Sequence, residues 1–231
     1  MNVEILENVD TAAARAAKII AEEANKAIAE RGRFVFAVSG GHTPWVMMRA
    51  LANEDVPWAS VHLVQVDERV AEAGNPDRNL THLHTSFLDH VSVKPQLHAM
   101  PVEAEDLQAA AAEYAATLRQ IAGSPPMLDL VHLGLGFDGH TASLVPGDAV
   151  LNVADRDVAI TDFYQDRQRM TLTYPIINRA RKILWVVTGE EKAGVLKRLM
   201  DGDVAIPAGR IRREQAVVIA DQDAAGRRKA A

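Results

Sequence analysis

An acid and a histidine, Asp138 and His140, follow a mainly apolar run and the glycines that end it. That run, Leu128–Leu133, has the composition of a buried strand in a parallel sheet, and it ends in Gly134 and Gly136. Glycines at the carboxyl end of such a strand permit a sharp turn and the close approach of a ligand, and ligands of open α/β sheets bind at that edge. An isolated histidine is more often structural. The neighbouring carboxylate and the position at a strand end favour a pair that transfers protons.

A second glycine-containing turn, Ser-Gly-Gly-His-Thr-Pro at residues 39–44, lies between a predicted strand and a predicted helix. Gly40 and Gly41 leave backbone N–H groups exposed at the start of the helix, where the helix dipole favours a phosphate. The hydroxyls of Ser39 and Thr43 add possible donors. The alternative is a tight turn that binds nothing, but the strand before it and the Thr-Pro after it favour phosphate binding. The motif is neither a P-loop nor a dinucleotide fingerprint, because the glycine and lysine spacing of both is absent.

Charged side chains are predicted at three further strand ends. The triplet Asp67-Glu68-Arg69 follows an apolar strand, where charges face the ligand crevice of a parallel sheet. Arg169 and Lys192 are each predicted near a strand-to-helix junction. Arginine binds phosphate through two parallel hydrogen bonds, and lysine adds a point charge. Each group alone is more commonly ordinary surface charge, so the prediction rests on their shared position at strand ends.

Strands and helices alternate along the chain, which predicts right-handed crossovers and a mainly parallel sheet with both faces covered. The predicted strands are 34–38, 61–66, 128–133, 158–161, 170–173, 182–188 and 216–220, and the predicted helices are 10–31, 45–51, 79–87, 105–121 and 190–200. Asp10 is expected to cap the first helix. We expect a single α/β domain over residues 1–231, with about 222–231 as a frayed tail.

The composition limits the classes of function. The chain has 231 residues, 48% hydrophobic and 24% charged, which predicts a globular core. A net charge of −6 argues against a nucleic-acid partner. The absence of cysteine removes disulfides, thiol nucleophiles and thiolate metal ligands. No apolar stretch approaches the roughly 20 residues that span a bilayer, and no signal-peptide pattern is present, so we expect a cytoplasmic protein without a membrane partner. The histidines at 82, 84 and 90 lack the zinc-protease spacing, so no metal site is expected.

Taken together, these segments resemble the 6-phosphogluconolactonase family, in family order from about residue 4 to residue 220. The resemblance is carried by residues 39–44, by 67–69 with Asn79, by 134–147, by 169–173 and by 188–192. It implies a three-layer α/β/α fold with a mainly parallel, Rossmann-like sheet, shared with glucosamine-6-phosphate deaminases, ribose-5-phosphate isomerases and CoA transferases. It also implies a sugar phosphate lactone as substrate. No metal or organic cofactor is implied, because the lactone carbonyl is already electrophilic.

The reaction implied by the resemblance is hydrolysis of 6-phospho-D-glucono-1,5-lactone to 6-phospho-D-gluconate in the oxidative pentose phosphate pathway. His140 would be the general base that activates water, and either Asp138 or Asp67 would orient its ring. Arg69 would stabilise the oxyanion. The phosphate would be held by Ser39, Gly40, Gly41, Thr43, Arg169 and Lys192. The division of the three cations between phosphate and carboxylate stays open, and we expect a monomer or a weak homo-oligomer.

The sequence departs from the family pattern at the rim of the expected pocket. Arg78 stands where the family usually has Ser, Val145 replaces a usual Phe, and residues 163–168 replace a Lys-Pro-Pro segment.

Two other functions would require different residues at specific positions of this chain. A glucosamine-6-phosphate deaminase-like isomerase carries a Glu five residues after the histidine and a Tyr in place of Arg69, whereas this chain has Val145 and Arg69. A non-catalytic sugar-phosphate sensor would lose the base, whereas Asp138 and His140 are both present. Both comparisons favour the lactonase.

Overall fold

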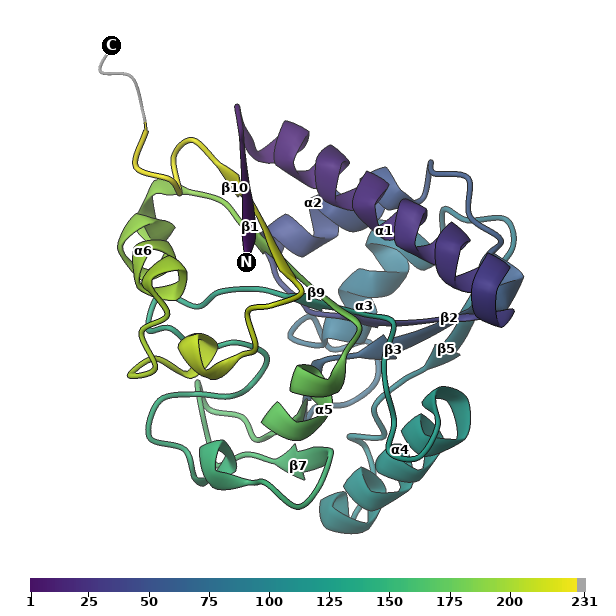
Figure 1. Cartoon of the computed structure of the whole chain (residues 1–231). Helices are drawn as coiled ribbons and strands as arrows, with labels where there is room; N and C mark the ends of the chain where they lie inside the picture. The colour runs from purple at the N-terminus through teal and green to yellow at the C-terminus, as the bar shows by residue number, and fades with distance from the viewer. Residues whose placement is uncertain (228–231) are drawn as a thin grey trace.

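The computed structural model describes residues 1–227 and is built around a parallel sheet (Figure 1). The seven strands of this sheet follow the order β1-β10-β9-β6-β2-β3-β5, and each hydrogen-bonded pair is parallel. Their bounds are β1 Asn2–Leu6, β2 Phe34–Val38, β3 Val61–Gln65, β5 Gln96–His98, β6 Leu130–Leu133, β9 Lys182–Val187 and β10 Ala216–Asp221. A separate antiparallel sheet has the order β4-β8-β7, with β4 Asp67–Arg69, β7 Val158–Ile160 and β8 Arg169–Leu172.

Helices cover both faces of the large sheet, which confirms the predicted three-layer architecture (Figure 1). The α-helices are α1 Val9–Arg31, α2 His42–Leu51, α3 Asn79–Leu83, α4 Leu107–Ala122, α5 Tyr174–Arg179 and α6 Ala193–Asp201. One hydrophobic core packs α1, α2 and α3 against one face. The other packs α4, α5, α6 and the small sheet against the opposite face. Alternation along β2 serves both cores, because Phe34 and Phe36 point to the first and Val35 and Ala37 to the second.

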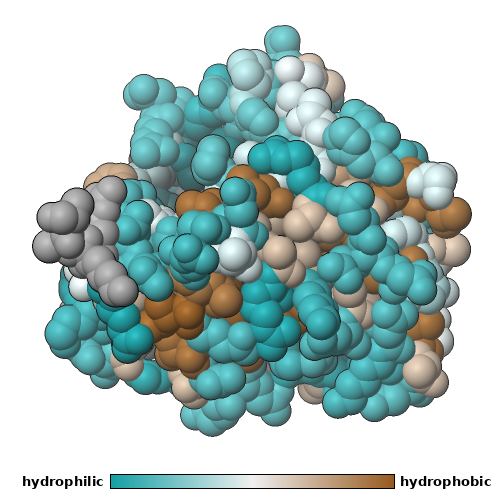
Figure 2. All heavy atoms as spheres, turned by 90° about the horizontal axis from the view of Figure 1, so that it is seen from above, coloured by the Kyte–Doolittle hydropathy of each residue, from teal (hydrophilic) through white to brown (hydrophobic). Residues whose placement is uncertain are grey.

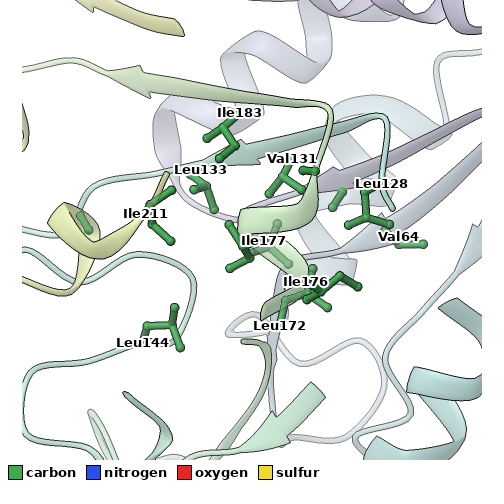
Figure 3. Packing of buried hydrophobic residues seen from close by; sticks show 14 of the residues in the cluster. Val64, Leu128, Val131, Leu133, Leu144, Leu172, Ile176, Ile177, Ile183 and Ile211 are labelled. Carbon is green, nitrogen blue, oxygen red and sulfur yellow. The ribbon is translucent and has the colours of Figure 1, made fainter. Parts of the chain in front are cut away.

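The second core holds the strand that leads to the predicted acid–base pair. Val131 and Leu133 of β6 and Ile183 of β9 lie close to Ile176 and Ile177 of α5 (Figure 3). All five side chains have no exposed surface. Each contributes about 1.5–3 kcal/mol relative to exposure, so the end of β6 is held rigidly beneath Gly134.

The structure differs from the sequence-based prediction in one helix cap, in the bounds and pairing of several strands, and in three elements that were not predicted. Asn8, not Asp10, caps α1, because its side chain accepts from Thr11 N–H and Thr11 reciprocates; Asp10 lies in the first turn. The predicted strand at 61–66 ends at Gln65, and Asp67–Arg69 forms its own strand in the small sheet. Two more of the predicted strands, β7 and β8, also pair there and not in the large sheet. The strands β1 and β5 and the helix α5 were not predicted from the sequence.

The carboxyl-terminal segment continues beyond β10 as hydrogen-bonded turns. The carboxylate of Asp221 accepts from the Ala224 N–H at 2.8 Å, and Ala224 is buried. Within the predicted tail, Ala224 therefore packs on the protein, whereas Gln222, Gly226 and Arg227 are exposed, and residues 228–231 lie outside the described part. The face in Figure 2 is mostly hydrophilic. Within residues 1–227, no helix is long and apolar enough to cross a membrane.

Candidate active site

A cavity of about 610 Å³ opens where β2, β6 and β9 end. The strand order reverses at this point, since the chain proceeds from β2 to β3 in one direction and from β6 to β9 and β10 in the other. Such a reversal separates the turns after neighbouring strands and creates a crevice. The turns after all three strands line the cavity, and β4, β8 and the start of α3 close one side. Its size suits a small-molecule ligand.

The predicted acid and histidine form a hydrogen-bonded pair in the turn after β6. Asp138 Oδ1 lies 2.6 Å from His140 Nδ1 and 3.1 Å from the backbone nitrogen of the same residue. Burial alone would raise the pKa of Asp138, but the hydrogen bonds and charge of His140 lower it to about 2. The ionised carboxylate only accepts hydrogen bonds, so Nδ1 carries the proton of the neutral ring. Nε2 then holds a free lone pair, with no hydrogen-bond partner among the described residues.

Glycine is required beneath the His140 ring. A Cβ on Gly136 would lie 2.1 Å from His140 Nδ1, far inside ordinary contact, whereas a Cβ on Gly134 would meet nothing within 4 Å. Gly139 has φ 86° and faces Ile206, so it too has no room for a side chain. The turn therefore presses the imidazole against the backbone and limits where the ring can move.

Asp67, the other carboxylate predicted to orient the histidine, has different partners. Its Oδ2 accepts from the Ser143 hydroxyl at 2.6 Å. Asn79 Nδ2 donates to the Asp67 backbone carbonyl at 2.9 Å and lies 3.4 Å from Oδ1. Asp67 is buried and lines the cavity, but the carboxylate that accepts the hydrogen bond from the His140 ring is Asp138.

Glu68 and Asn79 belong to motifs visible in the sequence, but neither was predicted to be a residue of the site, and both organise it through hydrogen bonds. Glu68 is fully buried and accepts from the backbone N–H groups of Arg69, Asn79 and Leu80 at 2.8, 2.8 and 2.9 Å. It thereby satisfies the first donors of α3. Asn79 in turn accepts from Arg69 Nη1 at 2.7 Å. The family position of Asn79 was visible in the sequence, but its contacts were not.

Glu68 also lies 3.3 Å from the guanidinium of Arg78, the departure noted at this rim. Arg78 is buried and forms a second ion pair with Glu103 at 2.7 Å. Charges buried in this way need several partners, and the two carboxylates provide them.

Two arginines face each other across the small sheet. Arg69 of β4 and Arg169 of β8 are directly opposite in the antiparallel register, and both line the cavity. Arg169 therefore begins a strand. The prediction that it lies near a strand-to-helix junction was wrong. Burial lowers the pKa of Arg169, the Asp67 charge opposes this, and the Arg69 charge adds to it. In each arginine, Nε is buried without a hydrogen-bond partner in the described part of the chain.

This arrangement favours a bound anion. Like charges directly opposite each other are destabilising in an antiparallel pair, and a buried unsatisfied donor costs roughly 1–3 kcal/mol. An anion between the guanidiniums would relieve both costs.

A second group of donors lies at the start of α2. Among residues 1–227, no side chain caps this helix at Gly41, which leaves its first N–H groups for a ligand. The hydroxyls of Thr43 and Thr188 are 2.6 Å apart, which joins this turn to the turn after β9, and Lys192 of that turn also lines the cavity. Ser39 lines the cavity as well, but its hydroxyl proton goes to the His132 carbonyl at 3.1 Å. Its single donor is therefore committed to the protein.

An α/β crevice with an acid–base pair and two cationic regions defines a class of proteins that bind small anionic molecules. Residues 7–220 match the family described as glucosamine-6-phosphate isomerases/6-phosphogluconolactonase, and the chain belongs to this family. The match confirms the resemblance inferred from the sequence. Within residues 1–227, no group of three or more histidine and carboxylate side chains is placed to hold a metal ion.

Individual relatives are similar over most of their length. A 6-phosphogluconolactonase of Synechocystis is 40% identical over 200 residues, covering 84% of this chain and 82% of the relative. One of Mycobacterium tuberculosis is 32% identical and covers 98% of both chains. Among solved structures, a 6-phosphogluconolactonase from Shewanella baltica has a TM-score of 0.85 at 25% identity, covering 96% of this chain and 97% of that one. A monomeric glucosamine-6-phosphate deaminase has a TM-score of 0.84 at 21% identity, covering 99% and 100%, and shares the fold.

Proposed function

We propose that this protein is a 6-phosphogluconolactonase, which hydrolyses 6-phospho-D-glucono-1,5-lactone to 6-phospho-D-gluconate. The observation that carries the proposal is the His140 ring, whose Nδ1–H is held by an ionised Asp138 while Nε2 stays free in a cavity with anion-binding groups. A lactone carbonyl is electrophilic enough to react with water that a base activates. The proposal therefore includes neither a metal nor an organic cofactor.

In the proposed reaction, His140 Nε2 removes a proton from water as the water oxygen attacks C1. The carbonyl π electrons move to oxygen and form a tetrahedral oxyanion. This oxyanion then collapses, the bond from C1 to the ring oxygen breaks, and the imidazolium returns its proton to the departing oxygen. The carboxylic acid ionises in water, so one lactone and one water give one carboxylate and one proton. Asp138 holds the ring and stabilises the imidazolium between the two proton transfers.

The two cationic regions suit the two ends of the substrate. The N-terminus of α2 and Lys192 would hold the 6-phosphate, since uncapped backbone donors and a point charge both favour that dianion. Arg69 would stabilise the oxyanion and the carboxylate that follows. Arg169 lies directly opposite Arg69, so we assign it to the same end of the substrate.

The primary test measures consumption of the phosphorylated lactone above its spontaneous hydrolysis, with Asp138 and His140 intact. Purified protein should accelerate lactone opening and release no ammonia from glucosamine 6-phosphate. Val145, which stands where the deaminase has its glutamate, is buried and cannot accept a hydrogen bond from the ring. Ammonia release without lactonase activity would reverse the assignment, and tight sugar-phosphate binding with neither activity would indicate a sensor. A cytoplasmic location and a monomeric or weakly associating chain are parts of the same proposal.

A further inference from the structure

We propose that Tyr164, in the loop of residues 161–168 between β7 and β8, is a positioning residue that links the His140–Asp138 pair to Arg169. The inference deepens the proposed lactonase function and rests on it. It concerns the segment in which this chain departs from the family pattern.

Three contacts place Tyr164 between the acid–base pair and the arginine. Its hydroxyl donates to Asp138 Oδ2 at 3.3 Å. Its ring meets the His140 ring edge to face, with centroids 5.6 Å apart and an interplanar angle of 68°. The guanidinium carbon of Arg169 lies 5.0 Å from the centroid of the same ring, a cation–π distance. A single side chain therefore contacts the general base, its carboxylate partner and one of the two opposed arginines.

The phenol is a hydrogen-bond donor under working conditions. Burial raises the pKa of Tyr164, the Asp138 charge and hydrogen bond raise it further, and only Arg169 opposes them. Asp138 thus receives two donors on different oxygens: the His140 ring on Oδ1 and the tyrosine on Oδ2. A carboxylate held at both oxygens cannot rotate freely about its Cβ–Cγ bond, so the direction of the imidazole is fixed through it.

The loop is built to hold the tyrosine in place. Gln165 and Asp166 have φ values of 51° and 62°, a left-handed pair at the tip of a tight hairpin closed by Tyr164 and Arg167. Non-glycine residues in this region are strained and persist where their surroundings hold them. Arg167 anchors the loop in this way, because its Nε and Nη2 donate to Asp77 Oδ2 at 2.8 and 2.6 Å. Gln165 provides a second anchor, because its side-chain oxygen accepts from Arg169 Nη2 at 3.0 Å.

The hydroxyl and the ring of Tyr164 have separable roles. Tyr164→Phe removes the donor to Asp138 and keeps an aromatic face for Arg169, whereas Tyr164→Leu removes both. We therefore expect the two variants to divide their effects between turnover and binding. Phe163→Ala is the matched control, because the neighbouring Phe163 side chain is 74% exposed.

The experiment measures kcat, KM and the pH profile of lactone hydrolysis, with 6-phosphogluconate affinity by calorimetry. Tyr164→Phe should lower kcat by roughly 3- to 10-fold, the range for one lost hydrogen bond, with an affinity within about 2-fold of wild type. The acidic limb of the pH–rate profile of this variant should move to higher pH, because the Asp138 carboxylate loses the phenol hydrogen bond that partly offsets its negative charge. Tyr164→Leu should also bind 6-phosphogluconate roughly 5- to 10-fold more weakly, the range for a partly desolvated cation–π contact. Phe163→Ala should match wild type in all four measurements.

Two results would overturn the inference. The first is a Tyr164→Phe enzyme with wild-type kcat and pH profile, and the second is a Tyr164→Leu enzyme with wild-type affinity. Thermal unfolding of each variant separates these outcomes from a folding defect. If wild-type protein fails to accelerate lactone opening, the proposed function fails, and the calorimetric comparison of Tyr164→Leu with Tyr164→Phe still decides whether the tyrosine supports Arg169.

Discussion

Replacing Gly136 with alanine should disable the site while leaving the fold intact. The added Cβ would lie 2.1 Å from His140 Nδ1 and 2.2 Å from Cε1, so the ring itself must move. Carbon–nitrogen contacts become ordinary only at about 3.5 Å, which requires the imidazole to retreat by more than 1 Å. The hydrogen bond to Asp138 is only 2.6 Å long and breaks over that distance.

A misplacement of about 1 Å at a reacting group costs roughly 10²-fold in rate, or about 2.7 kcal/mol of transition-state stabilisation. We therefore expect kcat of Gly136→Ala to fall by about that factor. The assay is the initial rate of lactone hydrolysis, corrected for the spontaneous reaction, with 6-phosphogluconate affinity and thermal unfolding measured in parallel. Affinity should change little, because the phosphate donors of α2 are in a different turn.

Gly134→Ala is the control within the same turn, since its Cβ would meet nothing within 4 Å. It should keep kcat within about 2-fold of wild type, because the His140 ring has no reason to move. Normal turnover by Gly136→Ala, or equal impairment of Gly134→Ala, would show that the close contact between Gly136 and the His140 ring does not limit catalysis.

Three further predictions address the base, the cations and a buried histidine. His140→Ala should lower kcat by roughly 10²–10⁴-fold and keep its affinity for 6-phosphogluconate; near-normal turnover would remove His140 from the mechanism. Lys192→Gln should weaken binding of the phosphorylated lactone by roughly 10-fold or more and spare hydrolysis of unphosphorylated gluconolactone, whereas Arg169→Gln should impair both lactones. Equal effects of the two changes would contradict the division of the cations. His132 is fully buried, and burial lowers its pKa to about 3. As the pH falls, His132 is therefore protonated in the unfolded chain before it is protonated in the folded protein. The free energy of unfolding that depends on the neutral ring is fully present above about pH 6.5. It is lost as the pH falls from there toward 3, by up to about 1.4 kcal/mol per pH unit. His132→Asn keeps an acceptor for the Ser39 N–H. Urea unfolding at several values between pH 7.5 and 5 should show that the free energy of unfolding changes less steeply with pH in this variant than in wild type. An unchanged pH dependence would exclude His132 as its source.

The parts of the fold that were predictable are those with strong local patterns. Continuous hydrophobicity predicts buried strands such as Phe34–Val38 and Lys182–Val187, and an amphipathic pattern predicts α4. β1 and β5 were missed because they are edge strands and only partly buried. The small sheet was missed because its pairing joins residues about 100 positions apart, and no local pattern encodes such a register.

The same distinction applies to the site. Asp138 and His140 are two residues apart, so the sequence alone suggested their contact. The sequence could not show whether Asp138 or Asp67 orients the histidine, because Asp67 is engaged by Ser143 and Asn79 only in the folded structure. The opposition of Arg69 and Arg169 is likewise a consequence of strand register. Tyr164 belongs to a loop without a recognisable motif, and its importance is visible only from its three contacts.

The opposed arginines also connect the lifetime of the folded protein to the supply of its ligand. Without an anion, β4 and β8 carry facing positive charges and two unsatisfied buried donors, so the empty protein is less stable than its packing alone allows. Any anion that binds only the folded state adds stability by mass action, about 2.7 kcal/mol at a concentration of 100 Kd. A cell with abundant sugar phosphates would hold the chain mostly in its protected form. If sugar phosphates are the ligands, as proposed, a fall in their concentration would raise the population open to unfolding and proteolysis.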